Sequence, residues 1–309
     1  MTCATQQSDR TRGRRADGVR LAGTDGNLDT HRHAAIETCK SMAAEPTAEE
    51  GLAPASDEAE WTILYHGPVT FKGRAEFLRL MLEDAGVKYT NSADKLYGPT
   101  GRMDAFRGSA ENVAATDDVP FPTYFPPAIW HRPAGGDEVC VNQVAACVVY
   151  LGEQLGYAPS SAAERARADC ITQNALDYIS AGRLSFHPVQ GTMSYADQKE
   201  EGDLASAQWA KDKMGLWLQH FEKILKRNAS PTCPVAGGDA ITYADFVLFH
   251  VLEATLTQFN NEKYEMAWDK ADIPCLKEFH SSMKARPNLA VYYASGPERC
   301  PPFAGDSMM

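Results

Sequence analysis

An alternating pattern of apolar and polar residues at 61–65 gives the first predicted element of the chain. In the segment WTILY, side chains alternate with the period of two residues that a strand produces. After a loop at 66–72, the segment GRAEFLRLMLEDA repeats apolar residues at the spacing of one helical face. We therefore predict a strand, a loop and a helix that begins at Gly73 and Arg74. Such a unit places a tyrosine beside the N–H groups of a helix start, which suits a negatively charged ligand.

The next hundred residues continue this mixture of strands and helices. Apolar runs predict a second strand at 87–90, an aromatic strand entry at 120–129 and a further strand at 138–141. The short turn between the last two predicts that they pair antiparallel. A helical pattern follows over 142–156 and ends at a glycine, whereas the polar segment 91–118 predicts no element. This order favours a small mixed sheet covered by helices.

Beyond a short linker at 158–162 the pattern is helical throughout. The segment ITYADFVLFHVL opens with Thr242 and Asp245 in the T-x-x-D spacing of a capping box, so we interpret Asp245 as structural. The other helices are predicted at 161–181, with a stop at Gly182, and at 194–226, 275–285 and 289–294. We therefore expect an all-helical second domain.

The composition sets the domain boundaries and excludes some classes of function. Residues 1–57 have few large apolar side chains, so we predict a disordered extension, followed by an α/β domain at 58–157, a helical domain at 163–303 and a tail at 304–309. The chain of 309 residues has 44% hydrophobic residues, enough for packed cores. Its net charge of -11 argues against general affinity for nucleic acid or anionic membranes, but a local basic pocket can still hold an acidic small molecule.

No segment of the sequence has the apolar length of a membrane span, and the first thirty residues lack the apolar core of a secretory signal. We expect a cytoplasmic protein. Arginines between positions 10 and 20 leave an organelle transit peptide as the alternative. The eight cysteines show neither CxxC nor zinc-site spacing, so we interpret them as reduced thiols, with Cys147 in the core. We interpret the pair His31 and His33 as part of a solvated tail, and we predict no metal site.

Candidate chemistry gathers around the first strand. Tyr65 ends that strand, Arg74 begins the next helix, and Gln143 begins a later one. Two adjacent prolines precede another strand, and we predict a cis bond at 125–126 or at 126–127. These groups together suit an extended anionic peptide.

These segments, in this order, resemble one known family. The tyrosine, the loop, the GRAE segment, the prolines and VNQVAACVVYLGEQLG resemble the thioredoxin-like domain of cytosolic glutathione transferases. The segments ITYADFVLFHVL and ARPNLAVYYAS resemble the helical domain of the same family. The resemblance spans about 61–303, and GRAE is most similar to the tyrosine-type classes sigma, alpha and pi. It implies a thioredoxin-like α/β domain followed by an all-α domain.

The resemblance also implies a role for each candidate residue. Tyr65 would donate its hydroxyl hydrogen to the sulfur of glutathione, and Arg74 would help to hold the anion. In the wall of the site, Pro127 would be the cis proline and Pro126 would present its backbone to the cysteinyl part; alternatively, Pro126 is the cis residue and Phe125 supplies both backbone groups. The γ-glutamyl end would bind Gln143 and the backbone N–H of Val144. Tyr65, Arg74, Phe125, Pro126, Pro127, Gln143 and Val144 are thus the predicted site residues.

The chain departs from the family pattern in three places. Tyr65 lies further before Gly73 than in the tyrosine classes, so that Pro68 takes the position of the tyrosine in an ungapped match and Thr70 becomes an alternative donor. Val144 stands where the family has serine. The segment 91–118 offers only Lys95 for the glycine end of glutathione.

The function implied by the resemblance is transfer of the glutathione thiolate to small hydrophobic electrophiles, in detoxification, by a homodimer. Glutathione would be the co-substrate. A glutathione-dependent isomerase or peroxidase is an alternative on the same fold. A non-catalytic binding or assembly module is a second alternative, favoured by Val144 and by the longer loop.

Overall fold

A four-stranded mixed sheet forms the first part of the described chain. The computed structural model describes residues 59–65, 71–92, 126–228, 234–260, 262–264 and 267–304, and all of them belong to one compact unit, Leu52–Met309. The strands are β1 (Glu60–Leu64), β2 (Thr90–Ser92), β3 (Ala128–Arg132) and β4 (Val139–Asn142), in the order β2-β1-β3-β4. β1 is parallel to β2 and antiparallel to β3, which is antiparallel to β4, so the predicted mixed sheet is confirmed.

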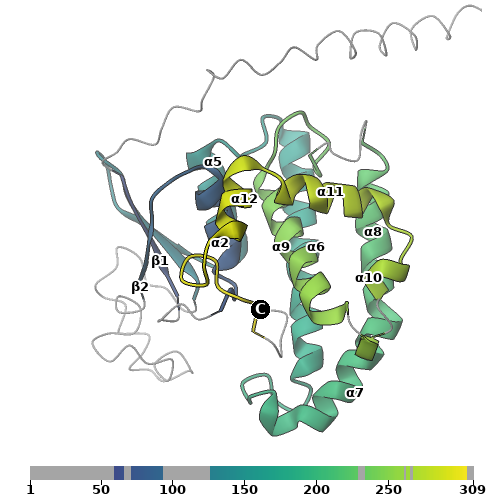
Figure 1. Ribbon diagram of the computed structural model, residues 1–309. Helices are drawn as coiled ribbons and strands as arrows, with labels where there is room; N and C mark the ends of the chain where they lie inside the picture. Colours follow the sequence, from purple (N-terminus) through teal and green to yellow (C-terminus); the bar gives the residue numbers. More distant parts are fainter. Residues whose placement is uncertain are drawn as a thin grey trace, which may run out of the picture. The chain divides into compact units, whose positions relative to one another are not determined.

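The helices α2 (Glu76–Asp84) and α5 (Val144–Leu155) pack against each other beside this sheet (Figure 1). All side chains of α2 are buried, because α2 also contacts two helices of the second half. Gly156 has φ 80° and ends α5 as predicted. The strand predicted at 87–90 begins only at residue 90, since the N–H of Val87 instead bonds to the carbonyl of Leu82 at 2.9 Å and closes the end of α2.

The second half is helical among its described residues, as predicted. Its α-helices are α6 (Ala162–Phe186), α7 (Lys199–Trp209), α8 (Gly215–Leu225), α9 (Tyr243–Phe259), α10 (Ala267–Lys270), α11 (Pro274–Lys284) and α12 (Pro287–Ala294). The short 3-10 helices η3 (Ala196–Gln198) and η5 (Glu262–Tyr264) and the π-helical turn η4 (Ala210–Met214) complete it. In Figure 1, α9 lies beside α6, and the two helices are in contact. No helix in these described ranges is both long and apolar enough to cross a membrane.

Some details of the predicted helices were wrong, and α12 begins at Pro287 and not at residue 289. α6 does not stop at Gly182 but continues to Phe186, because Gly182 is buried where α6 packs against its neighbours, and this packing outweighs a propensity cost of about 1 kcal/mol for glycine. The helix predicted at 194–226 is interrupted by the π-helical turn η4. The turn joins α7 directly to α8, so the backbone stays helical from α7 through α8.

The interpretation of Asp245 as structural is confirmed. Its carboxylate accepts hydrogen bonds from the N–H of Thr242 at 2.8 Å and from the N–H of Val235 at 2.7 Å. The side chain is fully buried, and this burial raises the pKa of Asp245 to about 6 although the hydrogen bonds act in the opposite direction. Cys147 is also a core residue, with its thiol donating to the carbonyl of Val141 at 3.1 Å.

A buried polar cluster fixes the start of α2. Glu76 accepts hydrogen bonds from Lys72 Nζ at 2.8 Å, from Arg79 Nη1 at 3.0 Å and from Tyr292 Oη at 2.9 Å. All four side chains are buried. Because a buried carboxylate is stable only when it is paired and hydrogen-bonded, these partners determine where the GRAE segment lies.

The segment that follows α12 packs against α2 and against Lys72, which precedes it. The N–H of Lys72 donates to the carbonyl of Pro302 at 2.8 Å, and Lys72 Nζ donates to Cys300 Sγ at 3.1 Å. Arg299 forms an ion pair with Glu83 of α2 at 2.5 Å. The last described residues of the chain therefore complete the surroundings of α2.

A second polar link joins the end of α2 to α12. Asp84 accepts hydrogen bonds from Arg286 Nε at 2.7 Å and Nη2 at 2.6 Å, and from Tyr157 Oη at 2.7 Å. This two-pronged geometry is the strong form of an arginine–carboxylate pair. The α/β half and the helical half are thus tied by charged groups as well as by apolar packing.

Candidate functional site

The sheet register brings three of the predicted site residues to one edge. Leu64 of β1 lies opposite Ala128 of β3, which in turn lies opposite Asn142 of β4. Tyr65, Pro127 and Gln143 are the next residues beyond this row, one on each strand. Two strand spacings amount to about 10 Å, so the edge is wide enough for an extended peptide.

Tyr65 lies at the start of α2 as well as at the end of β1. Its hydroxyl oxygen accepts a hydrogen bond from the backbone N–H of Arg74 at 3.0 Å, and its ring packs edge-on against Phe71 with 6.2 Å between the centroids. The side chain is only 5% exposed. The predicted proximity of phenol and helix start is therefore confirmed.

Gly73 makes this approach possible. Its φ of +55° lies in the left-handed region that favours glycine. A Cβ atom at this position would overlap the hydroxyl oxygen of Tyr65 and would lie 2.8 Å from the ring carbon Cε1. Both the backbone conformation and the space thus require glycine beside the phenol.

The electrostatic surroundings keep Tyr65 protonated at neutral pH. Burial of the ring is the largest effect and raises the pKa of Tyr65 above that of an ordinary phenol. The N–H of Arg74 and the charges of Arg79, Arg74 and Arg183 act in the opposite direction. The site therefore combines a neutral hydroxyl donor with cationic side chains, which is suitable for stabilising an anion.

Arg74 connects this site to the helical half. Its Nη2 donates to Ser180 Oγ on α6 at 2.8 Å, and the hydroxyl of Ser180 donates to the carbonyl of Leu176 at 2.6 Å. Arg74 is half-buried, and burial lowers the pKa of its guanidinium. Helix α6 therefore forms a second wall beside Tyr65.

The prediction of a cis proline is confirmed at the Pro126–Pro127 bond, so Pro127 is a cis residue. The alternative concerned the Phe125–Pro126 bond, which is not among the described parts of the chain. Pro126 has no backbone N–H and offers only its carbonyl oxygen to a ligand. Phe125, which that alternative required, lies outside the described residues.

Gln143 has an unusual backbone conformation for a residue other than glycine. Its φ is 71° and its ψ 119°, and its side chain is exposed. Such conformations cost about 1–3 kcal/mol and cluster at ligand sites. Val144 follows as the first residue of α5, and its side chain is buried in the core. A valine at this position therefore contributes to packing, while its backbone N–H remains part of a helix start.

Two histidines of the helical half are enclosed by the protein. His187 is buried and its Nδ1 lies 3.0 Å from the carbonyl oxygen of Met193, which fits a structural role. His250 is packed between the rings of Phe77 and Phe303. Thr70, Pro68, Lys95, His31 and His33 lie outside the described residues. Within the described part of the chain, no group of three or more histidine, cysteine or acidic residues has the arrangement of a metal site.

Ser180 and Arg183 belong to the site but were missed by the sequence analysis. They lie one helical turn apart on α6, and Arg183 is close enough to Tyr65 for each to affect the charge of the other. The sequence signal was limited to polar residues at i and i+3, on a helix that carries several other charged and polar residues. It could not be assigned to the site without knowing which side of α6 faces Arg74.

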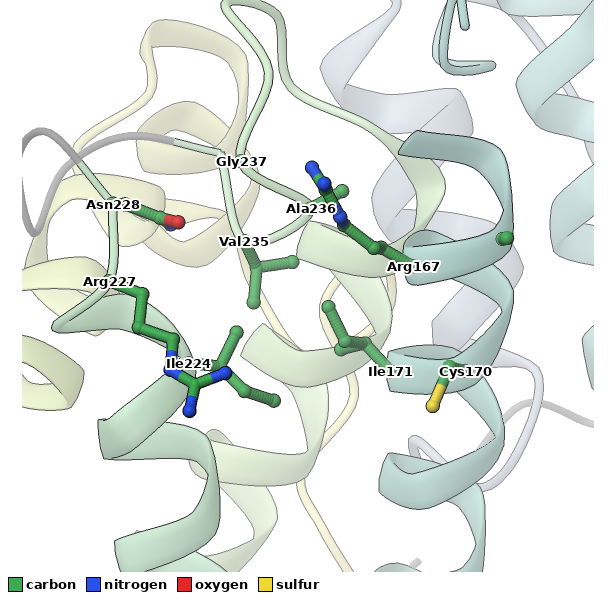
Figure 2. A pocket seen from close by; sticks show the side chains of 10 residues that line it. Arg167, Cys170, Ile171, Ile224, Arg227, Asn228, Val235, Ala236 and Gly237 are labelled. Atoms are coloured by element: carbon green, nitrogen blue, oxygen red, sulfur yellow. The ribbon is translucent and has the colours of Figure 1, made fainter. Parts of the chain in front are cut away.

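A separate cavity of about 620 Å³ lies elsewhere in the helical half (Figure 2). It is lined by the first half of α6, including Arg167 and Ile171, by the end of α8 with Ile224, and by the loop with Val235. Arg167 and Arg183 are sixteen residues apart on α6, or about 24 Å along the helix axis. This cavity is therefore distinct from the Tyr65 site.

Comparisons with known proteins agree with this architecture. Residues 185–296 match the family model described as "Glutathione S-transferase, C-terminal domain". The fold resembles the pi-class glutathione S-transferase of Onchocerca volvulus, with a TM-score of 0.52 and 22% identity over 76% of this chain and 92% of the other. It also resembles a sigma-class glutathione S-transferase of Fasciola hepatica, with a TM-score of 0.54 and 19% identity over 78% of this chain and 100% of the other. No curated protein matched the sequence.

Proposed function

We propose, from the match of residues 185–296 to the glutathione S-transferase C-terminal domain and from the likeness of the fold to glutathione S-transferases, that this chain joins the thiolate of glutathione to small apolar electrophiles. The observation that carries the proposal is the hydroxyl of Tyr65 at the N–H of Arg74, on the sheet edge that also bears Pro127 and Gln143. By likeness to the family, we also propose a cytoplasmic homodimer that removes reactive compounds.

The site has to keep a thiol deprotonated. A free thiol has a pKa of about 8.5, so only a few per cent is thiolate at neutral pH. Lowering this pKa by about 2 units requires about 2.7 kcal/mol of preferential stabilisation of the anion. One or two charge-assisted hydrogen bonds supply that amount. Tyr65 can donate its hydroxyl hydrogen to sulfur while its oxygen accepts the N–H of Arg74.

The same edge has groups for the rest of the tripeptide. In this proposal the carbonyl of Pro126 accepts the N–H of the cysteinyl part, and the amide of Gln143 binds the γ-glutamyl end, whose carboxylate suits the helix start at Val144. Glutathione is thus the co-substrate of the proposed reaction. Holding its sulfur next to the electrophile adds the rate advantage of proximity.

The test is conjugation of glutathione with 1-chloro-2,4-dinitrobenzene. We expect measurable turnover by the full chain and a loss of at least tenfold in Tyr65→Phe, because the donor to sulfur is removed. Tyr150→Phe is the matched control, since Tyr150 is a half-buried tyrosine of the same α/β half whose hydroxyl hydrogen-bonds to His131 Nδ1 at 2.8 Å and not to the start of α2. A Tyr65→Phe variant as active as the Tyr150→Phe control would remove Tyr65 from the proposed role.

A non-catalytic binding or assembly module is the second candidate. Two observations favour it: Pro126 lacks the N–H that would complete the backbone contact, and Val144 has no hydroxyl. Titration calorimetry with glutathione separates the two candidates, because absence of heat at millimolar ligand supports the module. If glutathione binds but aryl halide does not react, an organic hydroperoxide and an isomerisable ketone test the peroxidase and isomerase alternatives.

A further inference from the structure

Arg183 is a half-buried cation on the α6 wall of the Tyr65 site. It follows Ser180, which binds Arg74, by three residues, so its side chain lies on the same face of the helix. Its Nη2 donates to the carbonyl of Gly191 at 3.1 Å, while its Nε is buried and has no hydrogen-bond partner among the described residues. One nitrogen of the Arg183 guanidinium is thus hydrogen-bonded to the protein, and another has no hydrogen-bond acceptor among the described residues.

The charges around Tyr65 do not balance within the described chain. The half-buried or buried arginines at other places are paired: Arg79 with Glu76, Arg132 with Glu60, and Arg286 with Asp84. Neither Arg74 nor Arg183 forms an ion pair with any described residue. Burial lowers the pKa of both guanidinium groups, as expected for cations withdrawn from water without a counter-ion.

Arg74 and Arg183 together carry two positive charges, whereas the thiolate of glutathione carries one negative charge. In the proposed reaction the sulfur anion lies at Tyr65 and Arg74, while the carboxylate of the γ-glutamyl end lies about 10 Å away at the sheet edge near Gln143. Arg183 is on the helical side of Tyr65, away from that edge. The second carboxylate of glutathione, at its glycine end, is assigned by the family resemblance to the segment 91–118, so the half-buried guanidinium of Arg183 on α6 is available for an anion on another molecule.

Exposed apolar side chains lie next to this cation. Leu184 is 55% exposed and Val189 58%, although both are large hydrophobic residues. Leu184 Cδ2 lies 3.8 Å from the position that a Cβ atom on Gly191 would occupy, and Gly191 is the residue whose carbonyl binds Arg183. The end of α6 and the loop after it thus place apolar surface and positive charge side by side.

We propose that Arg183 makes the second-substrate side of the site select electrophiles that carry an anionic group, such as a carboxylate, on an apolar body. This inference rests on the proposed transferase function and adds the class of its second substrate. The guanidinium binds the carboxylate, Leu184 and Val189 cover the apolar part, and the electrophilic carbon faces the sulfur held at Tyr65. Arg183 acts as a specificity-determining residue and takes no part in bond formation.

The test uses two probes with the same reactive group. Ethacrynic acid has an α,β-unsaturated ketone, an apolar aryl body and a carboxylate, and its methyl ester lacks only the charge. The wild-type chain should show a higher kcat/KM for the acid than for the ester. In Arg183→Gln the ratio of the two values should fall by about tenfold, mainly through KM of the acid, and Arg183→Lys should retain most of the preference. Tenfold corresponds to about 1.4 kcal/mol, which lies within the range of one charge-assisted hydrogen bond.

A matched control is Arg167→Gln, which removes an exposed arginine from the same helix, at the cavity of Figure 2, and changes the net charge equally. We expect it to keep the ratio. An equal ratio in wild type and Arg183→Gln overturns the inference, and so does an equal fall in the Arg167→Gln control. Because the ratio compares two substrates of one variant, a general loss of folded protein does not change it.

Calorimetry of both probes on wild type and Arg183→Gln distinguishes this inference from the proposed function. If neither probe nor aryl halide is turned over, the transferase proposal fails. A binding preference for the acid that disappears in Arg183→Gln would still support the anion site. Equal binding of acid and ester by the wild-type chain would refute it.

Discussion

Replacing Gly73 by alanine tests the close packing of Tyr65 against the start of α2. An alanine at φ +55° costs about 1–2 kcal/mol in the backbone alone. Its Cβ would also overlap the hydroxyl of Tyr65 and lie 2.8 Å from its ring, and such overpacking costs about 1–3 kcal/mol. We therefore expect the free energy of unfolding to fall by about 2–5 kcal/mol. Because the phenol has to shift, conjugation activity should fall as well.

Gly86→Ala provides the comparison that separates strain from contact. Gly86 also has a positive φ, +68°, but the nearest atom to a Cβ placed there is Asn288 Nδ2 at 3.6 Å, an ordinary contact distance. Its expected loss is the backbone part only, about 1–2 kcal/mol. Both variants are measured by equilibrium urea denaturation and by the aryl halide assay. Equal losses of stability, together with full activity of Gly73→Ala, would refute the argument that this glycine makes room for the phenol.

Two further predictions concern stability. Burial lowers the pKa of His250 to about 3, so the folded state binds its proton less readily than the unfolded state, and stability should fall as the pH drops from about 6.5 towards 3. Denaturation midpoints over this range should depend less on pH in His250→Leu, and an identical pH dependence in both proteins would contradict the assignment. Arg286→Ala removes the two-pronged bond to buried Asp84 and should cost about 2–3 kcal/mol in urea denaturation, whereas Arg299→Ala, which breaks an exposed arginine's pair with Glu83, should cost about 1 kcal/mol or less. Equal losses for the two arginines would show that burial does not set the strength of these pairs.

The architecture could be predicted from the sequence, because apolar residues recur with one period in a strand and with a different period in a helix. Three predicted features depend on local patterns: strand β1, which ends at Leu64 just before Tyr65, the capping box of Asp245 and the stop of α5 at Gly156. The continuation of α6 through Gly182 was not predicted, since it depends on packing against helices distant in sequence. The local pattern of apolar and polar residues does not show which distant helices pack against α6.

The candidate site was only partly accessible to the same reasoning. Tyr65, Pro127 and Gln143 each follow or precede a strand, so the sheet register places them together. Ser180 and Arg183 come from a helix whose rotation about its axis is set by tertiary packing, and a pattern of polar residues does not say which partner they meet. The side of the candidate site that contains Tyr65, Pro127 and Gln143 was thus predictable from the order of the motifs, whereas the wall formed by α6 depends on tertiary packing.

The contact of residues 299–302 with the start of α2 has a consequence for biosynthesis. Two partners of Lys72, the thiol of Cys300 and the carbonyl of Pro302, are far from it in sequence. Cys300 is synthesised 228 residues after Lys72. Until then, the charged groups at the beginning of α2 lack part of their enclosure, and long-range contacts of this kind form slowly. Translation therefore delivers the α/β half first, but the enclosure of α2 in that half is complete only after residues 299–302 have been synthesised.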